Sequence, residues 1–413
     1  MIILVGVALS GPAASAQTLV GHHDPVNVGA PTRLDWIFAV ANQSPANPPG
    51  DWQAEYDSTK QQYELFVPAG LNPRKAAPLV LFISAGDKPA GWNQWQSVCQ
   101  QAGVVFGSPY GAGNNCELPR RVRIVLDVLD DVARRRAVDP DRVYLTGFSG
   151  GARVACGIAF ALPEYFGGVI GVCGAERLRD ESWLRQRVAD RLSVALVTGE
   201  QDFNRNELEL LRGPLLADVG VRGKVWAVPQ MGHAIPDAQV LAEVLKWLDE
   251  GAGDRGRKAR QWPAMRIGGS SIPSRTGWAD LLFKEARTRL QRPATLYSGL
   301  MQLQGLATRW PDVPAAGAAR KLLAEYDARP ERPWEEDDLA EQRRFLVAEA
   351  RALDRYGSSS FPPQYAKERP AVLAKAIELW QQVRDDRPDS PAGKEAAQRI
   401  PELERKLGEG GGR

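Results

Sequence analysis

The hydrophobic pattern divides the chain into two parts of different character. Between about residues 60 and 250, short apolar runs alternate with amphipathic stretches. The runs are rich in Val, Ile, Leu and Phe without strict alternation, as expected for strands buried on both faces of a parallel sheet. They span residues 63–67, 79–84, 104–109, 143–147, 168–173, 193–198 and 224–228.

Helical periodicity fills the intervals between these runs. It is clearest over residues 118–136, where one face carries Val122, Val125, Leu126, Leu129 and Val132. Further helices are expected at 95–101, 152–161, 208–218 and 238–250. Alternation of strands and helices over this length predicts an α/β fold with a doubly wound, mostly parallel sheet, here placed at residues 60–250.

After residue 250 the strands give way to helices. Residues 251–262 begin with a Gly-rich, charged run and are expected to form a linker. Residues 263–407, rich in Ala, Leu, Arg and Glu, predict a smaller all-α domain, and residues 408–413 a disordered tail. The composition of this helical domain is compatible with binding to a protein partner.

One short motif occurs twice in the helical part. Pro-Asp-x-Pro-Ala stands at 311–315 and 388–392, each time between two predicted helices. The helices before it are expected at 300–309 and 373–385, and those after it at 316–326 and 393–407. The motif is similar to the turn of tetratricopeptide-like helix pairs, whose period of about 34 residues would leave room for a degenerate pair between the two copies. An ordinary helical bundle that uses the same turn twice is the alternative.

The amino terminus has the pattern of an export signal. Residues 2–8 are apolar, residues 10–12 interrupt the run, and Ala14-Ser15-Ala16 offers small residues for cleavage. We therefore expect a signal peptide at 1–16, an amino-terminal extension at 17–59, and a secreted or periplasmic protein. No Lys or Arg precedes the apolar run, so a buried amino-terminal strand is the alternative.

Export would permit disulfides among the four cysteines. Cys99 with Cys116, around a loop, is the pairing to test first. Cys156 and Cys173 lie in apolar segments, where buried free thiols are an equal alternative.

Composition excludes several classes of partner. The 413 residues carry 52 Lys and Arg against 50 Asp and Glu, a net charge of +2, so nothing favours nucleic acid or an anionic membrane surface. No stretch approaches the about 18 consecutive apolar residues of a membrane helix. The chain has only three histidines, which leaves few choices for a catalytic base.

The strongest chemical signal is Gly147-Phe148-Ser149-Gly150-Gly151, between a predicted strand and a helix rich in small residues. This context is that of a nucleophile elbow, in which a tight turn exposes the serine oxygen at the end of the sheet. The flanking glycines are needed because strand and helix approach closely. The Gly150 N–H, at the start of the helix, is expected to donate to the oxyanion.

The acid and then the base follow the serine along the chain. His22 and His23 are adjacent on a Pro- and Asn-rich segment and would point opposite ways, which disfavours a metal site. His233, after the last predicted strand, is expected to be the base. Asp202, in the loop after the 193–198 strand, is expected to orient it, with Glu200 and Asp237 as rivals. The set implies no cofactor and no metal.

Two further features would complete such a site. The second oxyanion donor is expected in the loop after the 79–84 strand, at Ala85 or Gly86. Phe148, Trp92, Trp95 and Tyr110 are the candidates for the substrate pocket, although the last three fit packing at the rim equally well.

Residues 60–250 resemble the secreted α/β-hydrolases of the polyhydroxybutyrate-depolymerase, feruloyl-esterase and acetylxylan-esterase type. The resemblance rests on the motifs at 78–82, 139–151, 164–168, 198–205 and 231–233, and covers just under half of the chain. Many relatives have His-Gly where this chain has Ala85-Gly86. The resemblance implies an exported serine esterase that acts on small or polymeric esters through an acyl-enzyme. A serine peptidase of the same fold, or an inactive scaffold whose helical domain binds a partner, are the alternatives.

Overall fold

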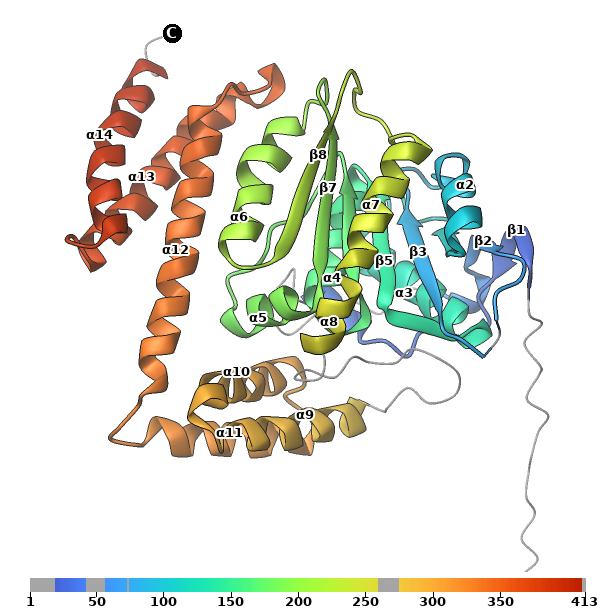
Figure 1. The fold of residues 1–413 in the computed structure, drawn as a ribbon, viewed down its shortest axis with the longest axis horizontal. Helices are drawn as coiled ribbons and strands as arrows, with labels where there is room; N and C mark the ends of the chain where they lie inside the picture. The colour runs from blue at the N-terminus through green and yellow to red at the C-terminus, as the bar shows by residue number, and fades with distance from the viewer. Residues whose placement is uncertain (1–18, 42–55, 73, 259–274, 411–413) are drawn as a thin grey trace, which may run out of the picture.

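The computed structural model describes residues 19–41, 56–72, 74–258 and 275–410 (Figure 1). Its centre is an eight-stranded sheet of order β1-β2-β4-β3-β5-β6-β7-β8. β2 runs antiparallel to β1 and β4, and all other neighbours are parallel. The strands are β1 (Gly21–Asn27), β2 (Gln62–Val67), β3 (Ala77–Ile83), β4 (Val105–Pro109), β5 (Val138–Phe148), β6 (Gly168–Val172), β7 (Ser193–Gly199) and β8 (Arg222–Val228). The predicted fold class, an α/β-hydrolase sheet followed by a helical region, is confirmed.

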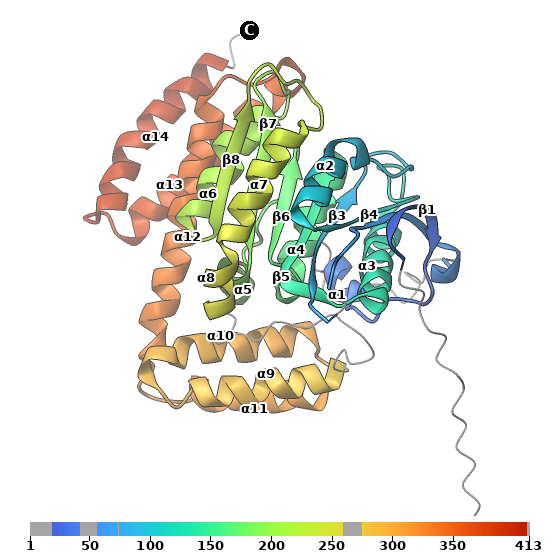
Figure 2. The same ribbon diagram turned by 45° about the vertical axis from the view of Figure 1, so that its right-hand side comes forward.

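Helices cover both faces of the sheet (Figures 1 and 2). On one face α2 (Trp92–Ala102) and α7 (Ala238–Glu250) share a buried apolar cluster with the strands. A larger cluster on the other face involves α3 (Leu118–Arg135), α4 (Gly150–Ala161), α5 (Ser182–Arg191) and α6 (Gly213–Asp218). The short α1 (Trp36–Ala41) packs on α3 and α4. The helix expected at 208–218 is divided into a π-helical turn, Glu207–Arg212, and α6.

Part of the predicted amino-terminal extension belongs to the sheet domain. β1 adds the eighth strand at the edge, and three aspartates of α3 bind the backbone that follows it. Asp131 accepts from the Gly29 N–H at 2.9 Å, Asp127 from the Thr32 N–H at 2.7 Å, and Asp130 from the Arg33 N–H at 2.8 Å. All three aspartates are buried. The predicted signal peptide at 1–16 lies outside the described residues.

The start of the predicted linker is helical. α8 (Ala252–Lys258) follows α7 after a single residue, Gly251, and is anchored by Arg255, which is only 3% exposed. Its guanidinium donates to the Ser193 hydroxyl at 2.8 Å and to the Asp141 carbonyl at 2.7 Å. The Gly-rich composition predicted a linker and gave no sign that one arginine fixes this segment to the sheet. Residues 259–262 of the predicted linker lie outside the described residues.

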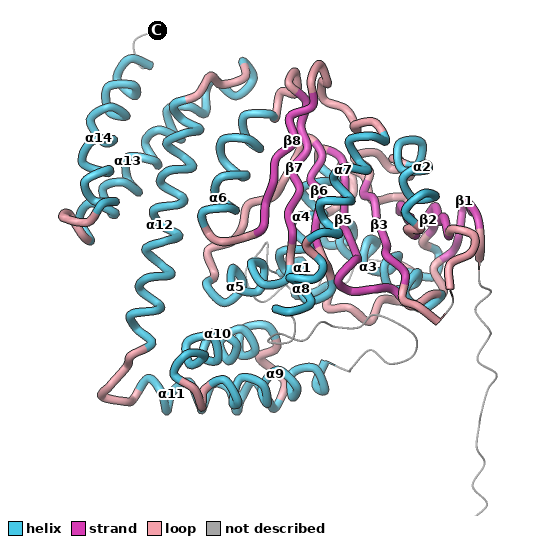
Figure 3. Tube along the Cα trace, in the orientation of Figure 1, coloured by secondary structure: helices cyan, strands magenta, loops and turns pink. Residues whose placement is uncertain are grey.

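Beyond residue 274 the described chain is helical (Figure 3). α9 to α11 lie beneath the sheet domain, α12 rises beside α6, and α13 and α14 pack on α12 (Figures 1 and 2). The helices are α9 (Arg275–Arg289), α10 (Pro293–Arg309), α11 (Pro314–Asp327), α12 (Trp334–Ser358), α13 (Arg369–Asp386) and α14 (Pro391–Gly410), with a 3-10 helix at Pro363–Glu368. No helix in these ranges is long and apolar enough to cross a membrane.

The repeated motif forms the same turn twice, but no helix pair stands between the copies. Val313 donates its N–H to the Trp310 carbonyl and Ser390 donates to the Arg387 carbonyl, so each turn joins two packed helices. The interval holds instead α12, a single helix of 25 residues, and the 3-10 turn. α14 continues to Gly410, into the tail that was expected to be disordered.

A buried ion pair joins the helical region to the sheet domain. Arg309 on α10 donates to the Glu164 carboxylate and to the Ala161 carbonyl, and both charged side chains are at most 4% exposed. Burial lowers the pKa of Arg309 to about 10, so the guanidinium stays charged at neutral pH. Arg187, 3.7 Å from Glu164, is the other cation of this cluster.

Replacing Arg309 with Ala is expected to lower the free energy of unfolding by about 3 kcal/mol, because Glu164 keeps its burial and loses its closest cation. Urea denaturation of the full chain measures the loss. Arg343→Ala is the matched control, since its ion pair with Asp386 is exposed and should move the midpoint little. Equal midpoints for the two variants would contradict a stabilising role for the buried pair.

Candidate active site

Ser149 has the backbone geometry of a nucleophile elbow. It lies between β5 and α4 with φ 55° and ψ −116°. A positive φ is unusual for a residue with a side chain, and such strain is found mainly at functional sites. The Ser149 N–H donates to the Val172 carbonyl at the end of β6 at 2.8 Å, which holds the turn in place.

The glycines around Ser149 are required by close backbone packing. A Cβ on Gly147 would lie 2.5 Å from the Gly151 carbonyl carbon, and one on Gly151 would lie 2.1 Å from the Ile83 carbonyl oxygen. A Cβ on Gly150 would meet the Asn114 carboxamide at 2.0 Å. Strand β3, the elbow and the first turn of α4 therefore approach one another as the sequence pattern predicted.

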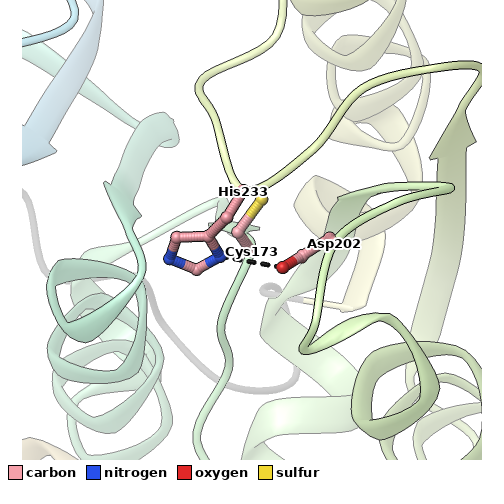
Figure 4. A group of neighbouring side chains, drawn as sticks. All are labelled: Cys173, Asp202 and His233. Atoms are coloured by element: carbon pink, nitrogen blue, oxygen red, sulfur yellow. Dashed lines mark hydrogen bonds and ion pairs between the residues drawn. The ribbon is translucent and has the colours of Figure 1, made fainter. Parts of the chain in front are cut away.

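His233 and Asp202 form a direct pair (Figure 4). The His233 Nδ1 lies 2.8 Å from the Asp202 Oδ1. A carboxylate only accepts hydrogen bonds, so Nδ1 carries the proton and Nε2 is left as an acceptor. The side chain of Asp202 is fully buried, whereas that of His233 is 21% exposed. The imidazole is thus held from the protein side and open on the other.

Asp202 has partners for both carboxylate oxygens. Thr198, near the end of β7, donates its hydroxyl to Oδ2 at 2.7 Å. The backbone N–H of Asn204 donates to Oδ1 at 3.1 Å. These bonds stabilise a buried negative charge and fix its direction toward His233. Thr198 and Asn204 were not singled out from the sequence, since neither carries a signal beyond its place in the loop.

The two rival carboxylates have other roles. Glu200 is exposed and accepts from the Gln230 N–H at 3.3 Å. Asp237 caps α7 by accepting from the Val240 N–H at 3.0 Å. Of the three acidic residues considered, Asp202 is the one that contacts His233 in the described part of the chain.

Two phenylalanines contact the imidazole of His233. Phe148, next to Ser149, has its ring 4.8 Å from that of His233, and Phe203, next to Asp202, stacks on it at 4.1 Å. The described residues contain no hydrogen bond from the Ser149 hydroxyl to His233. Such contacts are often open in a free enzyme and close when substrate binds. Phe203, which is 42% exposed, was missed from the sequence.

The loop after β3 offers one N–H to an oxyanion. Gly86 already donates its N–H to the Ser84 hydroxyl at 3.0 Å. The Ala85 N–H makes no hydrogen bond within the described ranges. Ala85 is therefore the better of the two expected donors, beside the Gly150 N–H at the start of α4.

A buried arginine orients the peptide that carries this N–H. Arg121 on α3 donates to the Ser84 carbonyl at 3.0 Å and to the Asn114 Oδ1 at 3.2 Å. In a trans peptide the carbonyl and the N–H point in opposite directions. The bond to the Ser84 carbonyl therefore turns the Ala85 N–H away from Arg121. Desolvation lowers the pKa of Arg121 from its usual value.

Three of the four aromatic residues expected in the substrate pocket have other contacts. Trp95 lies on the buried face of α2 and is 0% exposed, so it cannot line an open pocket. Trp92 stacks on His22 at 4.9 Å, and the Tyr110 hydroxyl donates to Asp24 at 2.8 Å. Both of these aromatic residues pack against β1. Spacing alone could not separate core from rim, and of the four candidates Phe148 is the one that contacts His233.

The four cysteines are free thiols, so the pairing of Cys99 with Cys116 is not present. Cys173 lies beside the acid–base pair (Figure 4), and its ligand atom and those of Asp202 and His233 are within 4.8 Å of one another. The Cys173 thiol donates to the Ala234 carbonyl, and burial, with the Asp202 charge, raises its pKa to about 12. A cysteine that ligates a metal does so as the thiolate, which a raised thiol pKa disfavours. The group therefore fits a catalytic pair with a buried thiol better than a metal site.

The two remaining histidines lie on the edge strand β1. His22 pairs with Glu64 at 2.8 Å, and His23 bonds to the Val20 carbonyl at 2.9 Å. The two side chains thus have separate partners.

No protein-family model and no curated protein matches the chain. Among solved structures it is similar to a thermostable esterase, with 21% identity and a TM-score of 0.35 over 47% of this chain and 60% of that one. It is also similar to S-formylglutathione hydrolase from Staphylococcus aureus, with 14% identity and a TM-score of 0.37 over 46% of this chain and 93% of that one. For a ferulic acid esterase the identity is 15% and the TM-score is 0.38, over 47% of this chain and 93% of that one. The chain thus spans less than two thirds of the thermostable esterase. The assignment of the fold rests on the strand order, and functional roles rest on the residues of this chain.

Proposed function

We propose that the protein is a serine hydrolase of carboxylic esters with Ser149 as nucleophile, His233 as base and Asp202 as its orienting acid. The observation that carries the proposal is the 2.8 Å pair between His233 and a fully buried Asp202. Phe148 links that pair to a serine in elbow geometry. Nucleophile, acid and base follow one another in the chain order of α/β-hydrolases.

The proposed reaction proceeds in two halves. The His233 Nε2 takes the Ser149 proton as the serine oxygen attacks the ester carbonyl, and the N–H groups of Gly150 and Ala85 donate to the oxyanion. Collapse of the tetrahedral intermediate expels the alcohol, which takes the proton from His233. Water, activated by the same imidazole, then attacks the acyl-enzyme and releases the acid. Asp202 keeps the proton on Nδ1 throughout.

The first test is labelling of the purified protein with a fluorophosphonate probe, followed by mass mapping. Modification of Ser149, and its loss in His233→Ala, is the expected result. A folded protein without a label would contradict the proposal and favour a binding role for the helical region. A panel of p-nitrophenyl esters beside chromogenic peptides then separates an esterase from a peptidase.

Replacing Arg121 with Met should reduce kcat for an ester substrate about tenfold. This loss is smaller than the fall in kcat of about 10²–10³-fold that follows removal of an oxyanion donor itself. The reason is that the Ser84–Ala85 peptide loses the bond that fixes its direction. Steady-state kinetics on p-nitrophenyl acetate measure the effect. Arg123→Met, on the same helix, is the matched control. Equal kcat values for the two variants would exclude this role for Arg121.

We also propose that the protein is exported and that its substrates are of the phenolic, acetylated-sugar or hydroxyacid ester type. Support comes from the Ala14-Ser15-Ala16 pattern and from the motifs at 139–151 and 198–205. Amino-terminal sequencing of protein recovered from expressing cells tests the first statement. A mature chain that still begins at Met1 would contradict cleavage.

A further inference from the structure

We infer that the helical region takes part in the active site by positioning the catalytic acid, through a hydrogen bond from Tyr365 to Asn204. The inference rests on the proposed function and assigns a role to a part of the chain that lies outside the sheet domain. Tyr365 is a positioning residue here, since it acts through Asn204 on Asp202.

The contact comes from the segment between α12 and α13, residues 359–368, here called the connector. In Figures 1 and 2 the connector lies at the end of the molecule where β7 ends, the same end at which the loop with Asp202 begins. Tyr365 donates its hydroxyl to the Asn204 Oδ1 at 3.3 Å. The Asn206 amide donates to the Ser360 carbonyl, which makes a second contact with the same loop. Phe361 packs on Tyr356 of α12, with rings 4.6 Å apart, and so ties the connector to its own helix.

Asn204 is the residue that transmits the contact. It is 2% exposed, and its backbone N–H donates to the Asp202 oxygen that also pairs with His233. Its side-chain amide donates to the Cys173 carbonyl at 2.8 Å. The Asn204 Oδ1 therefore faces Tyr365, and without the hydroxyl a buried carbonyl would lose its partner. The loop would have to rearrange to recover that bond, and Asp202 would move with it.

The side-chain amide of Asn204 also bonds to the backbone segment that packs against Ser149. Cys173 has a positive φ of 54° and follows directly after β6. Its neighbour Gly174 packs so closely that a Cβ there would lie 2.5 Å from the Ser149 carbonyl oxygen. One asparagine thus links the acid loop, the turn that supports Ser149 and the helical region. A shift at Asn204 should therefore affect catalysis more than substrate binding.

The expected result for Tyr365→Phe is a fall in kcat of about fivefold with KM unchanged, the size expected for one neutral hydrogen bond. The proton NMR signal of the His233 Nδ1–H, which lies far downfield when it is bonded to a carboxylate, should shift or broaden in the variant. A purely structural role for Tyr365 would lower the melting temperature without moving this signal. Tyr297→Phe is the matched control, because it removes a hydroxyl bond to Asp338 inside the helical region.

A double-mutant cycle tests whether the effect passes through Asn204. If it does, Tyr365→Phe has no further effect on kcat in an Asn204→Ala background. Additive losses, or a kcat for Tyr365→Phe equal to that of Tyr297→Phe, would overturn the inference. Labelling of Ser149 in the unmodified protein reports separately on the proposed function. A labelled protein in which Tyr365→Phe is silent refutes the positioning role alone, and an unlabelled one refutes the function itself.

Discussion

Ser149→Ala should lower kcat/KM for p-nitrophenyl esters by about 10³-fold or more, and fluorophosphonate labelling should disappear. The variant removes only the attacking oxygen. The elbow geometry is set by the backbone, through the bond from the Ser149 N–H to the Val172 carbonyl and the close packing of Gly147 on Gly151. The fold should therefore persist while the covalent step is lost. Residual hydrolysis would come from binding and the oxyanion donors alone.

The control for this variant is Ser182→Ala on α5, whose hydroxyl contacts Met301 of the helical region. It should keep its activity. Circular dichroism and urea denaturation of both variants confirm that each is folded. Retention of most of the activity by Ser149→Ala would show that another residue is the nucleophile, whatever the geometry of the elbow.

The strands were predictable where burial on both faces left a continuous apolar run. β3 reads Ala-Pro-Leu-Val-Leu-Phe-Ile and is entirely buried, so its sequence alone predicts a central strand. β1 was missed because it reads Gly-His-His-Asp-Pro-Val-Asn, an edge strand with one covered side. Its attachment comes from the aspartates of α3, which lie about 100 residues further along the chain.

Buried charge hid two helices from the hydrophobic pattern. α5 buries Arg185, Arg187 and Arg191, so its inner face looks polar in the sequence. α8 is fixed by the buried Arg255 in a Gly-rich segment. Arg191 bonds to Asp141, and Arg255 bonds to Ser193 and Asp141. These partners lie at least 50 residues away in the chain, and hydrophobic periodicity carries no information on them.

The candidate site divides in the same way. Ser149 and His233 follow from local patterns, because an elbow needs its glycines and the chain has few histidines. Asp202 follows from the place of its loop after a strand. Arg121 and Tyr365 could not be predicted, since each acts through one long-range hydrogen bond and neither lies in a motif.

Asp202→Asn should reduce kcat about 10³–10⁴-fold, while substrate binding changes little. The carboxylate accepts from His233, Thr198 and the Asn204 N–H. An amide has one oxygen, so it cannot accept on both sides. If its NH₂ group faces His233, Nδ1 must become the acceptor and the proton moves to Nε2, where it blocks removal of the Ser149 proton. The neutral amide also fails to stabilise the imidazolium that forms during attack.

Glu200→Gln is the matched control, because Glu200 lies in the same loop and its exposed carboxylate bonds to the Gln230 N–H instead of to His233. Steady-state kinetics on the same ester, with labelling of Ser149 as a second readout, compare the two variants. We expect a large loss for Asp202→Asn and near-normal rates for Glu200→Gln. The reverse order would identify Glu200 as the acid and would mean that the loop rearranges when substrate binds. Equal, small losses would mean that His233 acts without a carboxylate partner, in which case the buried pair serves stability alone.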